Sequence, residues 1–597
     1  MTNLDLGVIG NCRFSALVDK QARIVWSCMP RFDSDPVFCS LLSGIEAGAD
    51  DANGLYEIGV DGLTRSTQDY LSNTAVLRTE LEDAQGNLVE VLDLAPRFNR
   101  RGRRFRPTAI VRIVRPLRGR PRIRIRLRPR FDYGATAPSV THGSNHIRYV
   151  GPRDTLRLTG TAPVSYVLGE TWFHLEQPIH LYLGPDESLE RPVQEFCIEC
   201  FDETVSYWRE WVRMLAIPLD WQEAVIRAAI ALKLCWFEDT GAFVAALTTS
   251  IPEAQSSGRN WDYRYCWLRD AYYVIRALNR LGVVDIMEGY LAYLRNLIST
   301  AGAGPLQPLY GIALEQELDE REAPALAGYR GMGPVRTGNL AFRQRQNDIY
   351  GQIVLSAAQA FFDRRLLRPV GPEDFRELEK MGERASALHA TDDAGLWEFR
   401  NSSRVHTYSA AMCWAACDRL ALIARHLGLA SAARQWRRRA NEIHDTVVNG
   451  AWNERTGHFG SCFGGDDIDA SLLQLADIGF LSASDARFRG TLAAIEKRLV
   501  FGRHVKRYAH EDDFGLPETA FNVCAFWYIE ALHAVGRKAE AREHFEAMLA
   551  GRNHVGLLSE DSDIATGEMW GNYPQTYSMV GIINAAVLLS RPWSAVR

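Results

Sequence analysis

The hydrophobic pattern of this 597-residue chain changes its period near residue 195. Before that point apolar and polar residues alternate in short runs, which Gly, Pro, Asp and Asn separate, and Ile123, Ile125 and Leu127 alternate with arginines. A period of two is typical of strands with one exposed face. Because no segment long enough for a crossover helix separates the runs, we expect antiparallel strands packed as a sandwich.

The arginines of residues 122–128 admit two interpretations. They could bind an anion, or they could form the solvated face of a sheet. Charged residues that alternate with apolar ones are usually the exposed side of a half-buried strand. We therefore expect these arginines to face solvent.

From residue 195 onward the pattern becomes helical. Apolar residues in 195–216 recur at helical spacing, which predicts a linker helix. A chain of this length is too long for one ordinary core. We expect a β-sandwich domain over residues 1–195, a linker over 196–220 and a helical catalytic domain over 221–597.

Three segments in the second half repeat one design, an apolar helix followed by a turn with Gly and a second helix. They cover residues 274–294, 417–443 and 523–549, and their turns hold Gly282, Gly428 and Gly536. A Gly after a helix supplies the left-handed conformation that ends it. Repeated helix hairpins predict a toroid of paired helices. A superhelical solenoid is the alternative, but no fixed repeat length recurs.

Long stretches between the predicted helices hold most of the Gly, Pro and Trp residues that lie outside helices. Functional residues gather on such loops at one rim of a scaffold. The stretches are residues 248–269, 301–347, 391–407, 504–518 and 553–576.

The composition excludes several classes of protein. The formal net charge is −5 with no basic block, which argues against nucleic-acid binding. No run of 18 apolar residues is present, so we expect no membrane span. The first residues have neither a basic nor an apolar signal region, and we expect a cytoplasmic protein.

Motifs for cofactors and metals are also missing from the sequence. No G-x-G-x-x-G follows a strand, and there is no Walker A motif and no G-x-S-x-G. The 11 cysteines show no framework spacing, and Cys197 and Cys200 have no second pair with which to bind zinc. We expect reduced, buried thiols, no cofactor and no catalytic metal.

Two glutamates in the second half are candidates for acid–base chemistry. Glu398 lies between Trp397 and Phe399, and Glu560 follows a Leu-Leu-Ser stretch. The segment from Asn260 to Asp270 adds indole rings, arginines and further carboxylates. Aromatic faces cover the apolar face of a pyranose, and a pair of carboxyl groups supplies acid and base. These residues favour a glycosidase.

The same motifs resemble those of glycoside hydrolase family 15, which includes glucoamylases, glucodextranases, isomaltose-cleaving enzymes and bacterial trehalases. The resemblance covers nearly the whole chain, through residues 9–18, 30–34, 259–270, 346–351, 507–508 and 557–572. It implies an N-terminal antiparallel super-β-sandwich followed by an (α/α)6 barrel.

The resemblance also implies roles for the two glutamates. Glu398 matches the general acid of the family, and an indole neighbour would help it to keep a proton. Glu560 matches the general base, although Asp561, Asp563 and Glu568 could also hold a water molecule. Without the family, Glu398 would be taken for an ordinary loop residue.

Other residues match the sugar-binding positions of the family. Arg269 and Asp270 would grip the non-reducing glucose in subsite −1, or else form a salt bridge at a helix start. Arg507 and Tyr508 resemble a segment near subsite +1. The expected substrate-binding residues are Arg269, Asp270, Arg507 and the aromatic candidates Trp261, Trp267, Tyr310, Trp397 and Trp570.

We therefore expect an exo-acting, inverting hydrolase that releases β-glucose from short isomaltose- or maltose-type α-glucosides. A trehalase of the same family is the alternative. A phosphorolytic enzyme and a catalytically silent sugar-binding protein are more distant rivals. The expected partner is a small α-glucoside, and the oligomeric state stays open, a homodimer included.

Overall fold

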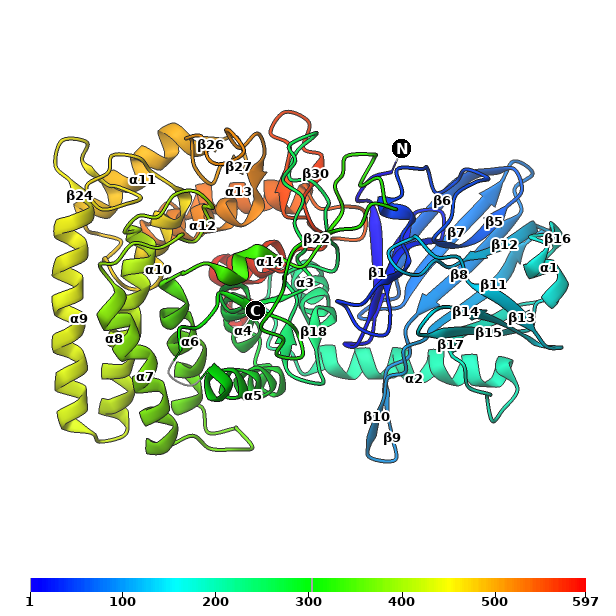
Figure 1. Ribbon diagram of the computed structural model, residues 1–597, viewed down its shortest axis with the longest axis horizontal. Helices are drawn as coiled ribbons and strands as arrows, with labels where there is room; N and C mark the ends of the chain where they lie inside the picture. Colours follow the sequence, from blue (N-terminus) through cyan, green and yellow to red (C-terminus); the bar gives the residue numbers. More distant parts are fainter. Residues whose placement is uncertain (1, 302–303, 597) are drawn as a thin grey trace.

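The computed structural model describes residues 2–301 and 304–596 and contains two parts side by side (Figure 1). The N-terminal part consists of antiparallel β-sheets, and the C-terminal part is helical. The predicted order of strands before helices is confirmed.

Two antiparallel sheets form the N-terminal part, and strands β1, β5, β7 and β8 make contacts between them. The first sheet has the order β1 (Leu6–Gly10), β2 (Ser15–Asp19), β3 (Arg23–Cys28), β5 (Leu55–Val60), β12 (Arg122–Arg128) and β16 (Phe173–His174), with β4 (Pro36–Phe38) beside β3. The second has the order β13 (Ser139–His142), β14 (His146–Val150), β15 (Thr155–Gly160), β17 (Ile179–Pro185), β11 (Ile110–Arg118), β8 (Leu88–Leu94), β7 (Leu77–Asp83) and β6 (Leu63–Tyr70). A hairpin of β9 (Phe98–Arg100) and β10 (Arg103–Phe105) and a short helix α1 (Val164–Leu168) complete this part.

The arginines of β12 do not all face solvent as the alternating pattern suggested. Arg126 is fully buried and donates a hydrogen bond to the buried Glu57. Arg128 pairs with Glu170 at 2.6 Å, and only Arg122 is about half exposed. The expectation of a solvated face is therefore wrong for Arg126. Residues 47–57 of the same part cover its guanidinium and supply the carboxylate of Glu57.

Helix α2 (Val193–Arg213) connects the two parts and runs beneath the β-sheets in Figure 1. It buries Trp208, Trp211 and Val212, and its N-terminal half packs on strands of the second sheet. A helix therefore spans most of the segment for which a linker was predicted. The division of the chain at residues 195 and 220 stays a prediction.

Paired helices form the C-terminal part. They are α3 (Gln222–Leu234), α4 (Leu268–Arg280), α5 (Val284–Ala301), α6 (Asp348–Ala358), α7 (Pro372–Leu388), α8 (Thr407–His426), α9 (Ala430–Ala451), α10 (Gln474–Asp477), α11 (Ala486–Leu499), α12 (Asn522–Ala534), α13 (Lys538–Ala550) and α14 (Thr576–Leu589). Within the described residues, the even-numbered helices from α4 to α14 contact one another in sequence order, and α14 closes the ring by contacting α4. The odd-numbered helices pack around the outside of this ring.

Three of the helix pairs are the predicted hairpins. The pairs α4–α5, α8–α9 and α12–α13 turn at Gly282, Gly428 and Gly536, whose φ angles are +79°, +75° and +91°. Only Gly adopts such angles without strain, so the glycines end the first helix of each pair as predicted.

Short strands and 3-10 turns order the long loops between the helices. The strands are β18 (Trp236–Phe237), β19 (Ala242–Phe243), β20 (Cys266–Trp267), β21 (Leu309–Tyr310), β22 (Arg321–Glu322), β23 (Arg336–Thr337), β24 (Trp452–Asn453), β25 (His458–Phe459), β26 (Val500–Phe501), β27 (His504–Val505), β28 (Ala520–Phe521), β29 (Asp561–Ser562) and β30 (Met569–Trp570). The 3-10 turns of this part are Leu340–Arg343, Gln359–Phe361, Ala470–Leu473 and, after the last helix, Trp593–Ala595; another, Ser40–Leu42, lies in the N-terminal part.

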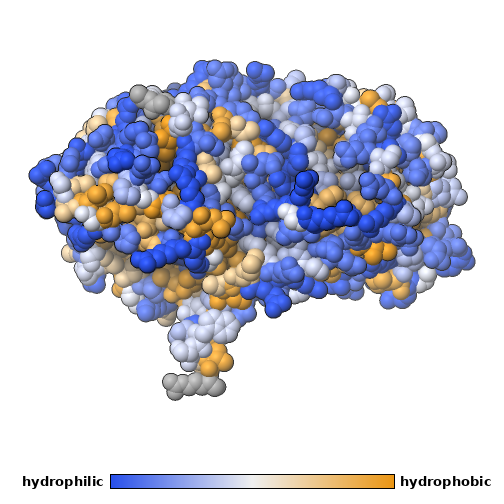
Figure 2. Space-filling view, turned by 90° about the horizontal axis from the view of Figure 1, so that it is seen from below, coloured by the Kyte–Doolittle hydropathy of each residue, from blue (hydrophilic) through white to orange (hydrophobic). Residues whose placement is uncertain are grey.

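The surface seen from below is mostly hydrophilic, with hydrophobic groups gathered mainly over the helical part (Figure 2). Among the described residues, no helix is long and apolar enough to cross a membrane. The same residues contain no group of three or more His, Cys, Asp or Glu side chains arranged to hold a metal ion. All 11 cysteines are free and buried.

Candidate active site

Five loops of the helical part line one pocket. The predicted functional loops are confirmed as neighbours, since each contributes residues to the lining. The residues that line it include Glu253, Arg259, Trp261, Tyr263, Trp267, Arg269, Asp270, Trp397, Glu398, Arg400, Arg507, Tyr508, Asp512, Asp513, Phe514 and Glu560.

Glu398 lies in a tight turn, and its own φ of +60° is a left-handed conformation that is uncommon for a residue with a Cβ. Its Oε1 accepts hydrogen bonds from Trp267 Nε1 at 2.7 Å, Arg269 Nη2 at 3.0 Å and Gln346 Nε2 at 3.3 Å. The side chain is 23% exposed, toward the pocket. The turn and three donors thus fix the carboxyl group in one orientation.

Arg269 and Asp270 lie in the first turn of helix α4, which begins at Leu268. Arg269 Nη1 donates to Gln346 Oε1 at 2.8 Å, and its Nε lies 4.0 Å from the carboxylate of Asp270. Burial raises the pKa of Asp270 to about 7, although the charge of Arg269 opposes this shift. Both residues line the pocket, and Arg269 also holds Glu398, so the pair does more than form a salt bridge at a helix start.

Glu560 is almost completely buried, with 1% of its surface exposed. Its Oε1 accepts a hydrogen bond from Tyr263 Oη at 2.6 Å, and its Oε2 accepts one from the backbone N–H of Asn572 at 3.3 Å. Gly571 has a φ of +74°, and a Cβ there would lie 2.6 Å from the Cβ of Glu560. The backbone of the loop therefore approaches this glutamate too closely for any other residue.

Burial and neighbouring acids raise the pKa of Glu560 well above its usual value. After burial, the largest causes are the carboxylates of Glu253 and Asp561. Asp561 is itself buried, and burial raises its pKa to about 8. Arg507 counters these charges, since it pairs with Glu253 and lies 3.9 Å from Asp561. The site thus surrounds one arginine with three acids.

The other carboxylates considered as bases lie away from this group. Asp563 accepts bonds from the turn at Ala565 and Thr566. Glu568 pairs with Arg330 at 2.6 Å, and neither acid lines the pocket. Of the acids considered in that segment, the pocket lining includes only Glu560.

The aromatic candidates divide into two groups. Trp261, Trp267 and Trp397 line the pocket. Tyr310 and Trp570 do not: Tyr310 is buried, with its hydroxyl bound to the N–H of Gln307, and Trp570 packs against Tyr329. Strands β21 and β30 turn these two rings toward the protein interior, so the expectation that they bind sugar does not fit their positions.

Sequence reasoning missed several residues of the site. Tyr263 and Gln346 lay within motifs that were recognised, but nothing in the pattern assigned them to Glu560 and Glu398. Glu253 carried no sequence signal, because its partner Arg507 is distant in the chain.

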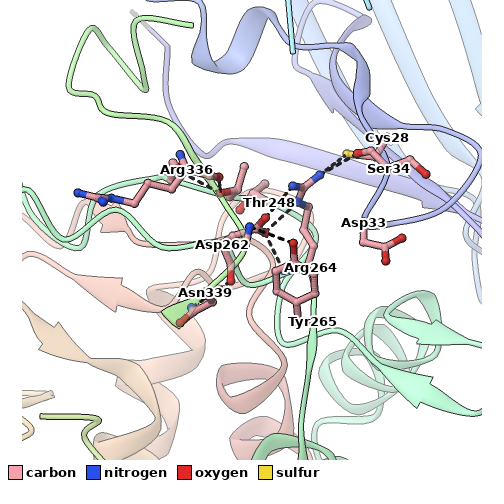
Figure 3. Close-up of polar contacts among 12 residues, drawn as sticks. Cys28, Asp33, Ser34, Thr248, Asp262, Arg264, Tyr265, Arg336 and Asn339 are labelled. Carbon is pink, nitrogen blue, oxygen red and sulfur yellow. Dashed lines mark hydrogen bonds and ion pairs between the residues drawn. The ribbon is translucent and has the colours of Figure 1, made fainter. Parts of the chain in front are cut away.

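The N-terminal part supports the loop that carries Tyr263 and Trp267. Arg264 is fully buried and donates two hydrogen bonds to Asp262, at 2.9 and 2.7 Å. The same guanidinium donates to the carbonyl of Ser34 at 2.8 Å and to the hydroxyl of Tyr133 at 2.8 Å. Figure 3 shows Arg264 reaching from the loop toward Ser34 and Cys28. One side chain therefore joins the sandwich to the pocket wall.

Comparison with known proteins identifies the family. The sequence model described as glycosyl hydrolases family 15 matches residues 220–587, and one described as trehalase-like, N-terminal matches residues 4–170. The chain belongs to glycosyl hydrolases family 15. It is an O-glycoside hydrolase, as the sequence predicted.

Several relatives that match over most of their length are named trehalases. The chain is 32% identical to a trehalase of Thermoplasma volcanium, over 97% of this chain and 92% of that protein. It is 33% identical to a trehalase of Thermoplasma acidophilum, over 96% and 97%, and 30% identical to a trehalase of Mycobacterium tuberculosis, over 98% and 89%.

A bacterial glucoamylase solved in complex with acarbose has a similar fold. The TM-score is 0.68 over 98% of this chain and 93% of that chain, at 13% sequence identity. This likeness supports the arrangement of an antiparallel β domain followed by a helical domain.

Proposed function

We propose that this family 15 glycosidase is a trehalase, which hydrolyses α,α-trehalose to two glucose molecules. The observation that carries the proposal is the match to trehalases over at least 96% of this chain, through both the sandwich and the helical part. These relatives favour the trehalase alternative over the main sequence-based hypothesis of an isomaltose- or maltose-type substrate.

In the proposed reaction Glu398 is the general acid and Glu560 the general base. Glu398 gives its proton to the bridging oxygen as the bond from C1 to that oxygen breaks. A water molecule attacks C1 from the opposite face and loses a proton to Glu560. Inversion releases the attacked ring as β-glucose and the leaving ring as α-glucose.

The contacts of both glutamates support these roles. Glu398 is held by Trp267 and Arg269 with an edge open to the pocket. Glu560 lies deep in the pocket, where Tyr263 orients its carboxyl group. We expect the two carboxyl groups to lie about 6.5–9.5 Å apart, which leaves room for the attacking water.

The high pKa of Glu560 has a consequence for the reaction. A base must be ionised to accept a proton, so activity should rise with pH as the acids near Arg507 lose their protons. Arg507 stabilises the ionised form of Glu560, which makes it part of the proposed machinery.

Glucose release from trehalose, maltose and isomaltose tests the proposal. We expect the highest kcat/KM on trehalose, and equal initial amounts of α- and β-glucose by NMR. Assays with and without phosphate detect phosphorolysis, which would yield one glucose phosphate for each glucose. Preference for maltose or isomaltose would refute the trehalase proposal while leaving the glycosidase assignment intact. The cytoplasmic location expected from the sequence stays a prediction.

A further inference from the structure

The residues that line the pocket are buried at its bottom and exposed at its mouth. Glu560 is 1% exposed and the Arg269 side chain 7% exposed, whereas Phe514 is 42% exposed. Arg400 and Asp513 also line the pocket at exposed positions. These three exposed residues mark the mouth of the pocket.

At the mouth, a cation covers the ring of Trp261. The guanidinium carbon of Arg400 lies 4.0 Å from the centroid of the indole ring. A cation at this distance is attracted to the ring face, and it occupies the surface on which a sugar ring would otherwise stack. The face of Trp261 beneath Arg400 is therefore not free to bind sugar.

Glu320 holds this cation in place. Its Oε2 accepts from Arg400 Nη2 at 3.2 Å, and its Oε1 accepts from Arg336 Nη1 at 2.7 Å. The Arg336 guanidinium carbon also lies 5.3 Å from the centroid of the Trp261 ring. Since the Glu320 side chain is only 7% exposed, its contacts are screened less than those of a surface ion pair.

A second set of contacts ties the backbone of Arg400 to another loop. The carboxylate of Asp513 accepts hydrogen bonds from the N–H groups of Arg400 at 2.6 Å and Asn401 at 3.3 Å. The rings of Phe514 and Trp261 pack edge to face, with centroids 5.3 Å apart. Loops that are distant in the sequence thus meet in one group at the mouth.

We propose that this group, called here the collar and made of Trp261, Glu320, Arg336, Arg400, Asp513 and Phe514, sets the length of the substrate. The collar closes the pocket beyond the second sugar ring, and Arg400 is its specificity-determining residue. The inference rests on the proposed function, because a trehalase must accept a disaccharide and has no use for further subsites. The substrate class is therefore a disaccharide without an extension on its second ring.

Removing the cation should open the stacking surface. We expect Arg400→Ala to raise kcat/KM for maltotetraose relative to maltose on the order of tenfold, because a third ring could then reach Trp261. Glu320→Gln should raise the same ratio by a smaller factor, since it loosens Arg400 without removing it.

Arg343→Ala is the matched control. Arg343 pairs with Asp319 at 2.7 Å and lies 5.1 Å from the ring centroid of Phe342, so it resembles Arg400 in its contacts. It does not line the pocket. In this variant we expect the ratio of kcat/KM for maltotetraose to that for maltose to stay within about twofold of the parent value, because most surface substitutions have small effects.

A binding measurement separates this inference from the proposed function. In a Glu560→Gln background, calorimetry of maltose and maltotetraose gives the ratio of their Kd values without turnover. If adding Arg400→Ala tightens the binding of maltotetraose relative to that of maltose, the result supports the collar even if trehalose proves not to be the substrate. An unchanged ratio in a folded Arg400→Ala variant overturns the inference, whatever the protein hydrolyses.

Discussion

Replacing Arg264 by Met should destabilise the protein and disturb the pocket together. Arg264 and Asp262 have no exposed side-chain surface, and the guanidinium donates both to Asp262 and to the sandwich. Removing one partner of a buried ion pair leaves the other charge uncompensated, which costs about 3–5 kcal/mol. The free energy of unfolding should fall by that amount, as measured by urea denaturation.

The same substitution should lower kcat, because Arg264 follows Tyr263 in the chain and Tyr263 holds Glu560. Small misplacements of reacting groups reduce rates strongly. Arg78→Met is the control: Arg78 pairs with Asp69 on the surface, where the side chains are 37% and 56% exposed. Its loss should cost less than about 1 kcal/mol.

A double substitution tests the cause. If the cost of Arg264→Met comes from an uncompensated carboxylate, then Arg264→Met combined with Asp262→Leu should recover part of the lost stability. A fall of less than about 1 kcal/mol in the single variant, or no recovery in the double variant, would refute the reasoning.

Three further predictions concern the pocket. Glu398→Gln and Glu560→Gln should each lower kcat about 10²–10⁴-fold with folding preserved, as measured by steady-state kinetics and thermal melting; near-parental turnover would show that another acid acts. Asp561→Asn should move the acidic limb of the profile of kcat/KM against pH to lower pH, because the Asp561 carboxylate raises the pKa of Glu560 and a lower pKa leaves the base ionised in more acidic solution; an unmoved limb would contradict this. Arg269→Lys should lower kcat/KM on trehalose, since Lys lacks the planar fork that reaches both Gln346 and Glu398; normal kinetics with a lower melting temperature would show a structural role instead.

Local pattern was enough to predict the architecture and the loops. The change from a period of two to a helical period separates strands from helices, because each period places apolar residues on one face of its own element. Gly282, Gly428 and Gly536 marked the helix turns, since a positive φ strongly favours Gly. Family motifs added Glu398 and Glu560.

Only the tertiary structure decided which polar groups meet. Tyr263 and Glu560 are separated by 297 positions, and Trp267 and Glu398 by 131. Periodicity states which face of an element is apolar, but not which distant side chain will compensate a polar group on the other face. The pattern therefore did not predict that Arg126 is buried beside Glu57 or that Arg400 covers Trp261. Such contacts depend on how the loops of the closed ring pack in three dimensions, because a buried charge is stable only where a partner from elsewhere in the chain reaches it.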